Sequence, residues 1–215
     1  TMSTAKPAID PARLSLDEWL PRAPALVDAL KRLGHERVAD LWLHFPLRYE
    51  DRTRLTRIRD LRPGDKALVE GRATEVQQRF RGRPMLLVAL EDDGAATLVL
   101  RFFHFNKSQA AQFEGGGTFR VFGEAREGKQ GLEFVHPKYQ RVVEEAVLDD
   151  RLTPVYPTVE GLPQARLQKL VAKALTLLPP DRPHEVMVES LLPSGLGMSL
   201  RDAMLTLHQP PAGSD

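Results

Sequence analysis

A near match to a nucleotide-binding motif is the first place where this sequence could do chemistry. Residues 123–129, GEAREGK, fit the first seven positions of a phosphate-binding P-loop and follow a predicted strand. Position 130 is Gln130, so the hydroxyl group that would bind magnesium is missing. The following residues, GLEFVHP, are strand-like, so no helix N-terminus would face a phosphate group. We therefore predict a hairpin turn here and no nucleotide site.

No other catalytic or metal-binding pattern emerges. The 6 histidines lack metal-ligand spacing, and neither HExxH nor GxSxG occurs in the sequence. The chain has no cysteine, which excludes disulfides, zinc ribbons and thiolate catalysis. The acidic pair Asp17–Glu18 lies at a predicted helix start, where acids favour the helix dipole. We predict no catalytic residue and no metal site in this segment.

Aromatic and basic residues gather instead in residues 98–106, LVLRFFHFN. Successive side chains of a strand point to opposite faces, so Phe103 would share a face with Arg101 and Phe105. Phe102 would lie on the other face. One face can fill a core, and we predict that Phe103 is exposed on the other, where its ring can stack on a nucleic-acid base.

Two arginine clusters offer contacts to phosphate groups. Arg79, Arg81 and Arg83 bracket a glycine in a predicted hairpin tip, where side chains are exposed and the backbone can approach a ligand. We predict that these three arginines, together with Arg101 beside Phe103, contact DNA phosphates. The second cluster has six arginines at 48–62 together with acids and apolar residues. It either binds phosphates or packs onto the predicted barrel.

The elements that position these residues follow from a change in periodicity at residue 65. Alternation of polar and apolar residues predicts five strands, at 67–77, 85–90, 96–105, 118–125 and 132–135. A short helix is predicted at 107–117, between the third and fourth strands. Three strands, a helix and two strands is the order of an OB-fold, a five-stranded Greek-key barrel. We predict an α+β, mainly β chain with this barrel and flanking N- and C-terminal helices.

Helical patterns lie on both sides of the predicted barrel. Ser15 and Glu18 have the spacing of a capping box, and amphipathic stretches follow it. Further helices are predicted at 163–178, 184–192 and 199–207. The predicted segments are a disordered N-terminus (1–14), a helical hairpin with an arginine-rich connector (15–63), an OB-fold domain (64–145) and a C-terminal helical segment (146–215).

Composition limits the partners and the setting. The formal net charge is only +1, so the local arginine clusters, and not bulk charge, indicate nucleic acid. No apolar run approaches the roughly 18 residues of a membrane helix, and the N-terminus has no signal-peptide core. The absence of cysteine is compatible with a reducing cytoplasm. We expect a cytoplasmic protein with no membrane partner.

The order of several motifs resembles one known family. The segments LGHERVADLWLHFPLRYEDRT, RFFHFN, VFGEAREGKQGLEFVHPKY, LTPVYPTVEGLPQARLQKLV and TLHQPP follow one another over about residues 20–210. They resemble the N-terminal wedge region of RecG-type ATP-dependent DNA helicases, bacterial enzymes that remodel stalled replication forks. The resemblance implies that a motor follows this segment, with ATP and magnesium as its cofactors.

The resemblance also implies a function, partners and contact residues. It assigns this chain an OB-fold wedge that binds branched DNA, such as replication forks and Holliday junctions, and helps to split strands in DNA repair and recombination. Phe103 would stack on an unpaired base at the branch point. Some members have a second aromatic residue four positions later, where this chain has Lys107, and a phosphate contact would replace that stack. We expect a monomer, with a single-strand-binding protein as a further candidate partner.

Two alternatives of other classes stay open. A free-standing OB-fold protein would bind single strands in preference to junctions. A protein-interaction module would use the same aromatic residues against another protein. Binding to forked, single-stranded and duplex DNA at one salt concentration separates the three hypotheses.

Overall fold

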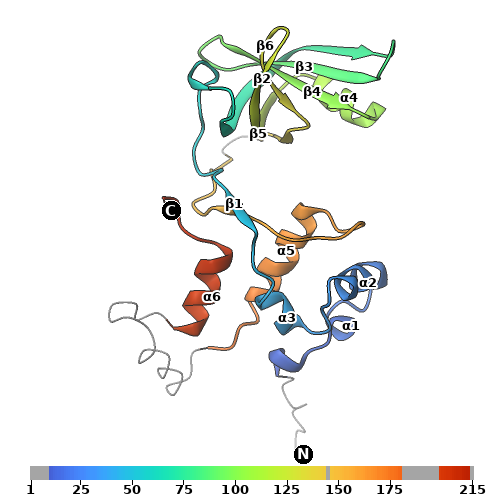
Figure 1. Ribbon diagram of the computed structural model, residues 1–215, viewed down its shortest axis with the longest axis vertical. Coiled ribbons are helices and arrows are strands. Elements are labelled where there is room, and N and C mark those ends of the chain that lie inside the picture. Colours follow the sequence, from blue (N-terminus) through green and yellow to red (C-terminus); the bar gives the residue numbers. More distant parts are fainter. Residues whose placement is uncertain (1–9, 144–145, 181–198, 214–215) are drawn as a thin grey trace, which may run out of the picture. The chain divides into compact units, whose positions relative to one another are not determined.

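The computed structural model describes residues 10–143, 146–180 and 199–213 (Figure 1). The chain divides into two compact units, one made of Thr1–Tyr49 with Thr153–Asp215 and the other of Glu50–Leu152. The predicted helix at 184–192 lies outside the described residues. Among the described residues, none of the helices has the length and apolar character needed to cross a membrane.

The second unit is a closed β-barrel. Its elements are η2 (Ile58–Asp60), β2 (Lys66–Arg79), β3 (Met85–Glu91), β4 (Thr97–Phe103), α4 (Lys107–Glu114), β5 (Thr118–Gly128), β6 (Gly131–Val135) and β7 (Lys138–Arg141). The strands pair in the order β2-β3-β4-β6-β5, and β5 also pairs with β2, which closes the barrel. Only the β4–β6 pairing is parallel among those of the described strands in this sheet. This order, with α4 between the third and fourth barrel strands, confirms the predicted OB-fold.

Alternation along β4 fills the barrel, as predicted. Leu98, Leu100 and Phe102 are buried, while the residues between them are only half-buried. Phe113 of α4 joins the same core, and its ring centroid lies 5.7 Å from that of Phe102. Burial of each such side chain stabilises the fold by about 1.5–3 kcal/mol. The opposite face of β4 is therefore the one that can carry a binding residue.

Two features of the barrel differ from the predicted strands. The strand predicted to reach residue 105 ends at Phe103, because His104 has a left-handed φ of 57° that interrupts the extended backbone. A further strand, β7, pairs with residues 119–122 of β5, and no strand was predicted there. The sequence of β7, KYQR, has too few apolar residues to show a clear alternation.

The P-loop-like residues form the β5–β6 hairpin, as predicted. Gly128 pairs with Gly131 across a turn at 129–130. Gly123 has a packing role, because a Cβ atom at this position would meet the ring of Phe134 at 2.9 Å. The element that follows the turn is a strand, so this segment lacks the helix N-terminus that holds phosphate in a P-loop.

The first unit is helical with a short sheet. Its elements are η1 (Pro11–Arg13), α1 (Leu16–Trp19), α2 (Pro24–Arg32), α3 (Val38–Trp42), β8 (Thr153–Val155), α5 (Gln164–Leu175) and α6 (Leu200–His208). The strand β1 (Arg48–Glu50) pairs with β8, and its first two residues belong to this unit. The predicted capping box is present: the Ser15 hydroxyl accepts from the backbone N–H of Glu18, and the Glu18 carboxylate accepts from that of Ser15. The segment predicted as disordered, 1–14, includes η1.

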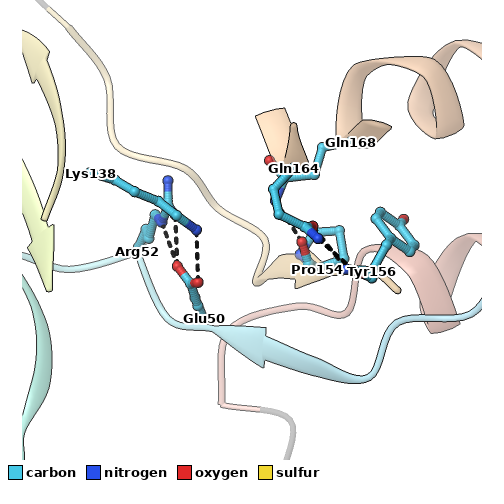
Figure 2. A network of polar contacts seen from close by, with 7 residues as sticks. All are labelled: Glu50, Arg52, Lys138, Pro154, Tyr156, Gln164 and Gln168. Atoms are coloured by element: carbon cyan, nitrogen blue, oxygen red, sulfur yellow. Dashed lines mark hydrogen bonds and ion pairs between the residues drawn. The ribbon is translucent and has the colours of Figure 1, made fainter. Parts of the chain in front are cut away.

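Side chains of α5 hold the PVYP segment after β8 (Figure 2). The Gln164 side chain accepts a hydrogen bond of 2.9 Å from the backbone N–H of Tyr156 and donates one to the carbonyl oxygen of the same residue. Gln168 donates to the carbonyl oxygen of Pro154 at 2.7 Å. These two glutamines satisfy backbone groups that would otherwise need strand partners or water.

Candidate nucleic-acid interface

The predicted arginine cluster lies at the tip of the β2–β3 hairpin. Arg79 pairs with Met85 across the last rung, and residues 80–84 form the loop. Arg79, Arg81 and Arg83 are all exposed. We refer to these three arginines as the tip arginines. They lie on a loop that a DNA backbone can reach, which is the geometry that the prediction requires.

The tip arginines carry positive charge that no neighbouring acid balances. None of them forms an ion pair with an acid of the described residues. Arg79 donates to the side-chain oxygen of Gln77 at 3.2 Å, which leaves its charge in place. The loop sequence RFRGRP contains no acid. Three unbalanced charges on one loop favour an anionic ligand over distances of about 10 Å at 0.1 M salt.

Phe103 lies beneath one of these arginines. The guanidinium carbon of Arg83 is 4.2 Å from the centroid of the Phe103 ring. The strand register explains the contact, because Met85, two residues after Arg83, pairs with Phe103. The ring of His136 lies 5.7 Å from Phe103, and the backbone N–H of Phe103 is 3.4 Å from Nε2 of His136.

Phe103 is therefore half-buried, whereas the sequence predicted an exposed ring. The strand alternation placed it correctly on the outer face of β4, but it could not foresee that Arg83 would cover the ring. A base can reach Phe103 if the guanidinium moves aside, or it can stack on the guanidinium plane itself. Arg83 and Phe103 form one composite surface in either case.

Arg101 is engaged within the barrel. Its Nη2 lies 2.8 Å and its Nε lies 3.1 Å from Oε2 of Glu133, across the parallel β4–β6 pairing. Both side chains are largely shielded from water. Since Glu133 neutralises most of its charge, Arg101 is the weakest of the predicted phosphate contacts.

Lys107 is the first residue of α4 and is exposed. The helix begins there because the Asn106 side chain accepts a hydrogen bond of 2.7 Å from the backbone N–H of Gln109. Lys107 follows Phe103 by four residues, and the left-handed His104 lies between them. Its ammonium group is available for the phosphate contact expected of it.

The second arginine cluster packs inward in part. Ile58, within this cluster, is buried in the barrel core. Arg52 lies over the ring of Phe122 at 4.8 Å and is 2.7 Å from the buried carboxylate of Glu50. Figure 2 shows the Glu50 carboxylate between Arg52 and Lys138, whose Nζ lies 3.0 Å from it. Burial raises the pKa of Glu50, but hydrogen bonds from Arg52 and Lys138 outweigh that effect, so the pKa lies below its ordinary value.

A cavity of about 550 Å³ in the barrel unit is a less suitable place for phosphate. Its lining contains more acidic than basic residues. The acids are Glu70, Glu91, Asp92 and Asp93, the arginines are Arg57 and Arg72, and the other lining residues are Leu55, Thr56, Gly71 and Thr118. Asp92 is buried and accepts the backbone N–H of Ile58 at 2.9 Å, so it has a structural role. The electrostatics of the barrel therefore favour the hairpin tip over this cavity as the site for DNA.

The chain matches a family model described as the RecG wedge domain over residues 23–178. The matched segment is well over half of the chain. The chain belongs to the RecG wedge domain family.

Relatives of this wedge domain are longer proteins. ATP-dependent DNA helicase RecG of Escherichia coli strain K12 is 42% identical over 192 residues, which are 87% of this chain and 27% of that protein. The RecG helicase of Haemophilus influenzae is 40% identical over 192 residues, which are again 87% of this chain and 27% of that protein. The chain thus spans about a quarter of the length of these relatives. A solved structure described as RecG bound to a three-way DNA junction has the same fold, with a TM-score of 0.73 and 22% identity over 98% of this chain and 28% of that one.

The structure of this RecG wedge domain shows a further exposed aromatic residue for which the sequence predicted no role. Phe80, in the loop between Arg79 and Arg81, is 68% exposed, and its ring centroid lies 6.0 Å from that of Phe105. The signal was available, because an aromatic residue between two arginines at a hairpin tip lies beyond the strand alternation that would bury it. The prediction of a stacking residue considered only the phenylalanines of residues 98–106.

A histidine network lies in the first unit of the wedge domain. We give this name to His35, His44, Tyr156 and His208. Nε2 of His35 is 3.0 Å from Nδ1 of His44, and the Tyr156 hydroxyl is 2.9 Å from Nδ1 of His208. Within the described residues, no group of three or more histidines, cysteines or acids could hold a metal ion.

Carbonyl oxygens fix the tautomers of this network. Nε2 of His44 lies 2.8 Å from the carbonyl of Pro157, and Nε2 of His208 lies 2.7 Å from that of Trp42. A carbonyl only accepts, so both Nε2 atoms carry protons and both Nδ1 atoms accept hydrogen bonds in the neutral rings. Burial, with a smaller effect from His44, lowers the pKa of both His35 and His208.

Proposed function

We propose that this chain is the DNA-binding wedge of a RecG-type ATP-dependent DNA helicase. In this role it binds branched DNA and holds the strands apart where they separate. Family membership supports the assignment, as do the relatives named ATP-dependent DNA helicase RecG. The observation that carries it is the end of the barrel where exposed, unbalanced arginines adjoin the Phe103 ring.

The residues divide between anchoring and stacking. The tip arginines and Lys107 contact phosphate groups, which gives affinity without base sequence preference. Phe103, with Arg83 over its ring, offers a stacking surface to a base that has lost its pairing partner. Stacking on an aromatic side chain contributes about 1–3 kcal/mol per base, and a DNA stacking step averages about 1.4 kcal/mol. One stack can therefore offset most of the cost of opening one step.

The wedge has a passive part in this mechanism. The hydrogen-bonded barrel blocks the duplex sterically, and the motor of the whole protein supplies work from ATP and magnesium. We assign no catalytic residue to the described segment. Repair and recombination at stalled forks and Holliday junctions, with a single-strand-binding protein as a further partner, follow as properties proposed for the whole protein.

Binding to forked, single-stranded and duplex DNA of matched length, at one stated salt concentration, tests the proposal. We expect the fork to bind most tightly. Tighter binding to single strands than to the fork would favour a free-standing single-strand-binding protein. Equal, weak binding to all three would favour a protein-interaction module.

A charge-matched control makes the test specific. The variant R79A/R81A/R83A removes the tip arginines, and K66A/R126A/K129A removes three other exposed cations of the same barrel. We expect the first variant to lose most of the fork affinity and the second to keep most of it. The reverse result would place DNA elsewhere on the barrel.

A further inference from the structure

We propose that Phe80 is a second stacking surface for an unpaired DNA base, separate from Phe103. The inference rests on the proposed function and adds to it a residue at the tip of the β2–β3 hairpin. Phe80 is the exposed phenylalanine among the described residues of the barrel unit, with 68% of its surface open to water. Single exposed apolar residues are common, so the surroundings of Phe80 decide whether it can bind a ligand.

The ring of Phe80 is supported from one side. Its centroid lies 6.0 Å from that of Phe105 with the planes at 44°. Phe105 is itself half-buried against the barrel core. This contact restrains the Phe80 side chain while leaving most of its surface open. A restrained ring loses less conformational entropy when a ligand binds, which favours a stacking role.

The charges around Phe80 identify the ligand. Arg79 precedes it and Arg81 follows it, and both are exposed without an acidic partner among the described residues. An aromatic ring between two cations matches the alternation of base and phosphate in a single strand. An apolar peptide would leave both arginines without partners, so a nucleotide is the better complement.

Phe103 and Phe80 differ in how a base can reach them. Arg83 lies over Phe103 at 4.2 Å, so that ring is already covered on one face. No cation–π contact covers Phe80 among the described residues. A base can therefore stack on Phe80 without displacing a protein group, and the hairpin tip can accept a base independently of the β4 site.

Four variants test this inference in the 215-residue chain. F80A removes the ring, F80L keeps an apolar side chain without an aromatic face, and F80W enlarges the aromatic face. V147A shortens an exposed apolar residue of the same unit and is the matched control. Affinity for a fork with unpaired bases at the branch point is measured by fluorescence anisotropy, and thermal unfolding is measured for each variant.

We expect F80A to bind the fork about 5- to 150-fold more weakly than wild type, the range of one lost stack. F80L should lose a similar amount, F80W should bind at least as well as wild type, and V147A should be unchanged. The salt dependence of binding should stay the same in F80A, because stacking releases no counterions. The melting temperature should change little, since the ring is mostly exposed.

Failure of this inference is distinguishable from failure of the proposed function. If F80A binds the fork as wild type does while F103A binds weakly, Phe80 is no stacking surface and the wedge assignment stands. If F80L retains full affinity, the contact is apolar and not aromatic, which also overturns the inference. If the wild type shows no preference for forked DNA, the proposed function itself fails.

Discussion

Arg83 and Phe103 form a cation–π pair in which the guanidinium carbon lies 4.2 Å from the ring centroid. The pair joins the hairpin tip to β4, so the phosphate-binding and base-stacking parts of the proposed interface are in direct contact. Such pairs contribute about 0.5–1 kcal/mol at exposed sites and more where water is excluded. A base that approaches Phe103 must therefore replace this contact or extend it.

Removal of the Phe103 ring should weaken fork binding more than folding. We predict that F103A loses about 1–3 kcal/mol of fork affinity, because one base stack disappears. The loss of stability should be modest, since the side chain lies half-buried on the outer face of β4. Anisotropy titration and thermal unfolding followed by circular dichroism provide the two readouts.

F102A is the matched control for F103A, because Phe102 is the neighbouring buried ring. Its loss should cost about 3–5 kcal/mol of stability. If F103A proves as destabilising as F102A while its fork affinity per folded molecule is normal, Phe103 is a core residue and the assignment is wrong.

The covered state of Phe103 predicts energetic coupling to Arg83. In a double-mutant cycle with R83A and F103A, the losses of fork affinity should be non-additive by about 0.5–3 kcal/mol, as expected for groups in contact. R81A provides the comparison, because Arg81 forms no cation–π contact with Phe103 among the described residues. Additive losses in the Arg83–Phe103 cycle would mean that the two residues bind DNA independently.

The segment with the P-loop-like sequence should not bind ATP. The β5–β6 hairpin has no helix N-terminus, and Gln130 stands where a hydroxyl would hold magnesium. We predict no shift in melting temperature with ATP and magnesium and no ATP hydrolysis by this chain. A stabilisation by ATP that K129A abolishes would contradict this prediction.

The histidine network predicts that the first unit loses stability in mild acid. Protonation of His208 would put a proton on Nδ1, which accepts a hydrogen bond from the Tyr156 hydroxyl. The pKa of His208 is lowered in the folded state, so the unfolded chain binds more protons than the folded chain near pH 6. The contribution of His208 to the free energy of unfolding is therefore fully present above the ordinary histidine pKa of about 6.5, and it is lost as the pH drops below that value. His35 adds to this effect, although Asp40 opposes it.

Tryptophan fluorescence can isolate this unit, because the only 2 tryptophans, Trp19 and Trp42, both lie in it. The free energy of unfolding should fall between pH 7 and pH 5 by at most about 1.4 kcal/mol per pH unit for each histidine. H208Q should reduce this slope. H104N, which alters an exposed histidine of the barrel at a φ that asparagine tolerates, should leave it unchanged. Identical slopes for wild type and H208Q would exclude His208 as the titrating group.

Local pattern was sufficient to predict the barrel but not its details. Alternation in 98–102 correctly placed Phe102 inside, because a strand with one buried face repeats every two residues. The end of that strand was missed, because a left-handed φ is uncommon at any residue other than glycine and a histidine such as His104 signals it only weakly. β7 was missed because its residues are largely polar, and its place depends on pairing with β5.

The candidate site was predicted in its composition more than in its geometry. The tip arginines follow from the turn sequence, and they lie at the tip. The cation–π contact between Arg83 and Phe103 depends on the β3–β4 register, which brings these two residues together although they are 20 positions apart in the sequence. The Arg101–Glu133 ion pair depends on the parallel β4–β6 pairing, which closes only when the whole barrel forms. Such long-range contacts cannot be deduced from local sequence.

A salt titration of fork binding tests most directly whether DNA binds at the hairpin tip. Each phosphate contact releases counterions, so each one lost should lower the slope of log affinity against log salt by roughly 0.7–0.9. We predict that R79A/R81A/R83A has a slope smaller than wild type by about 2–3, whereas K66A/R126A/K129A keeps the wild-type slope. Equal slopes for wild type and the tip variant would contradict the account and move the interface away from the β2–β3 hairpin.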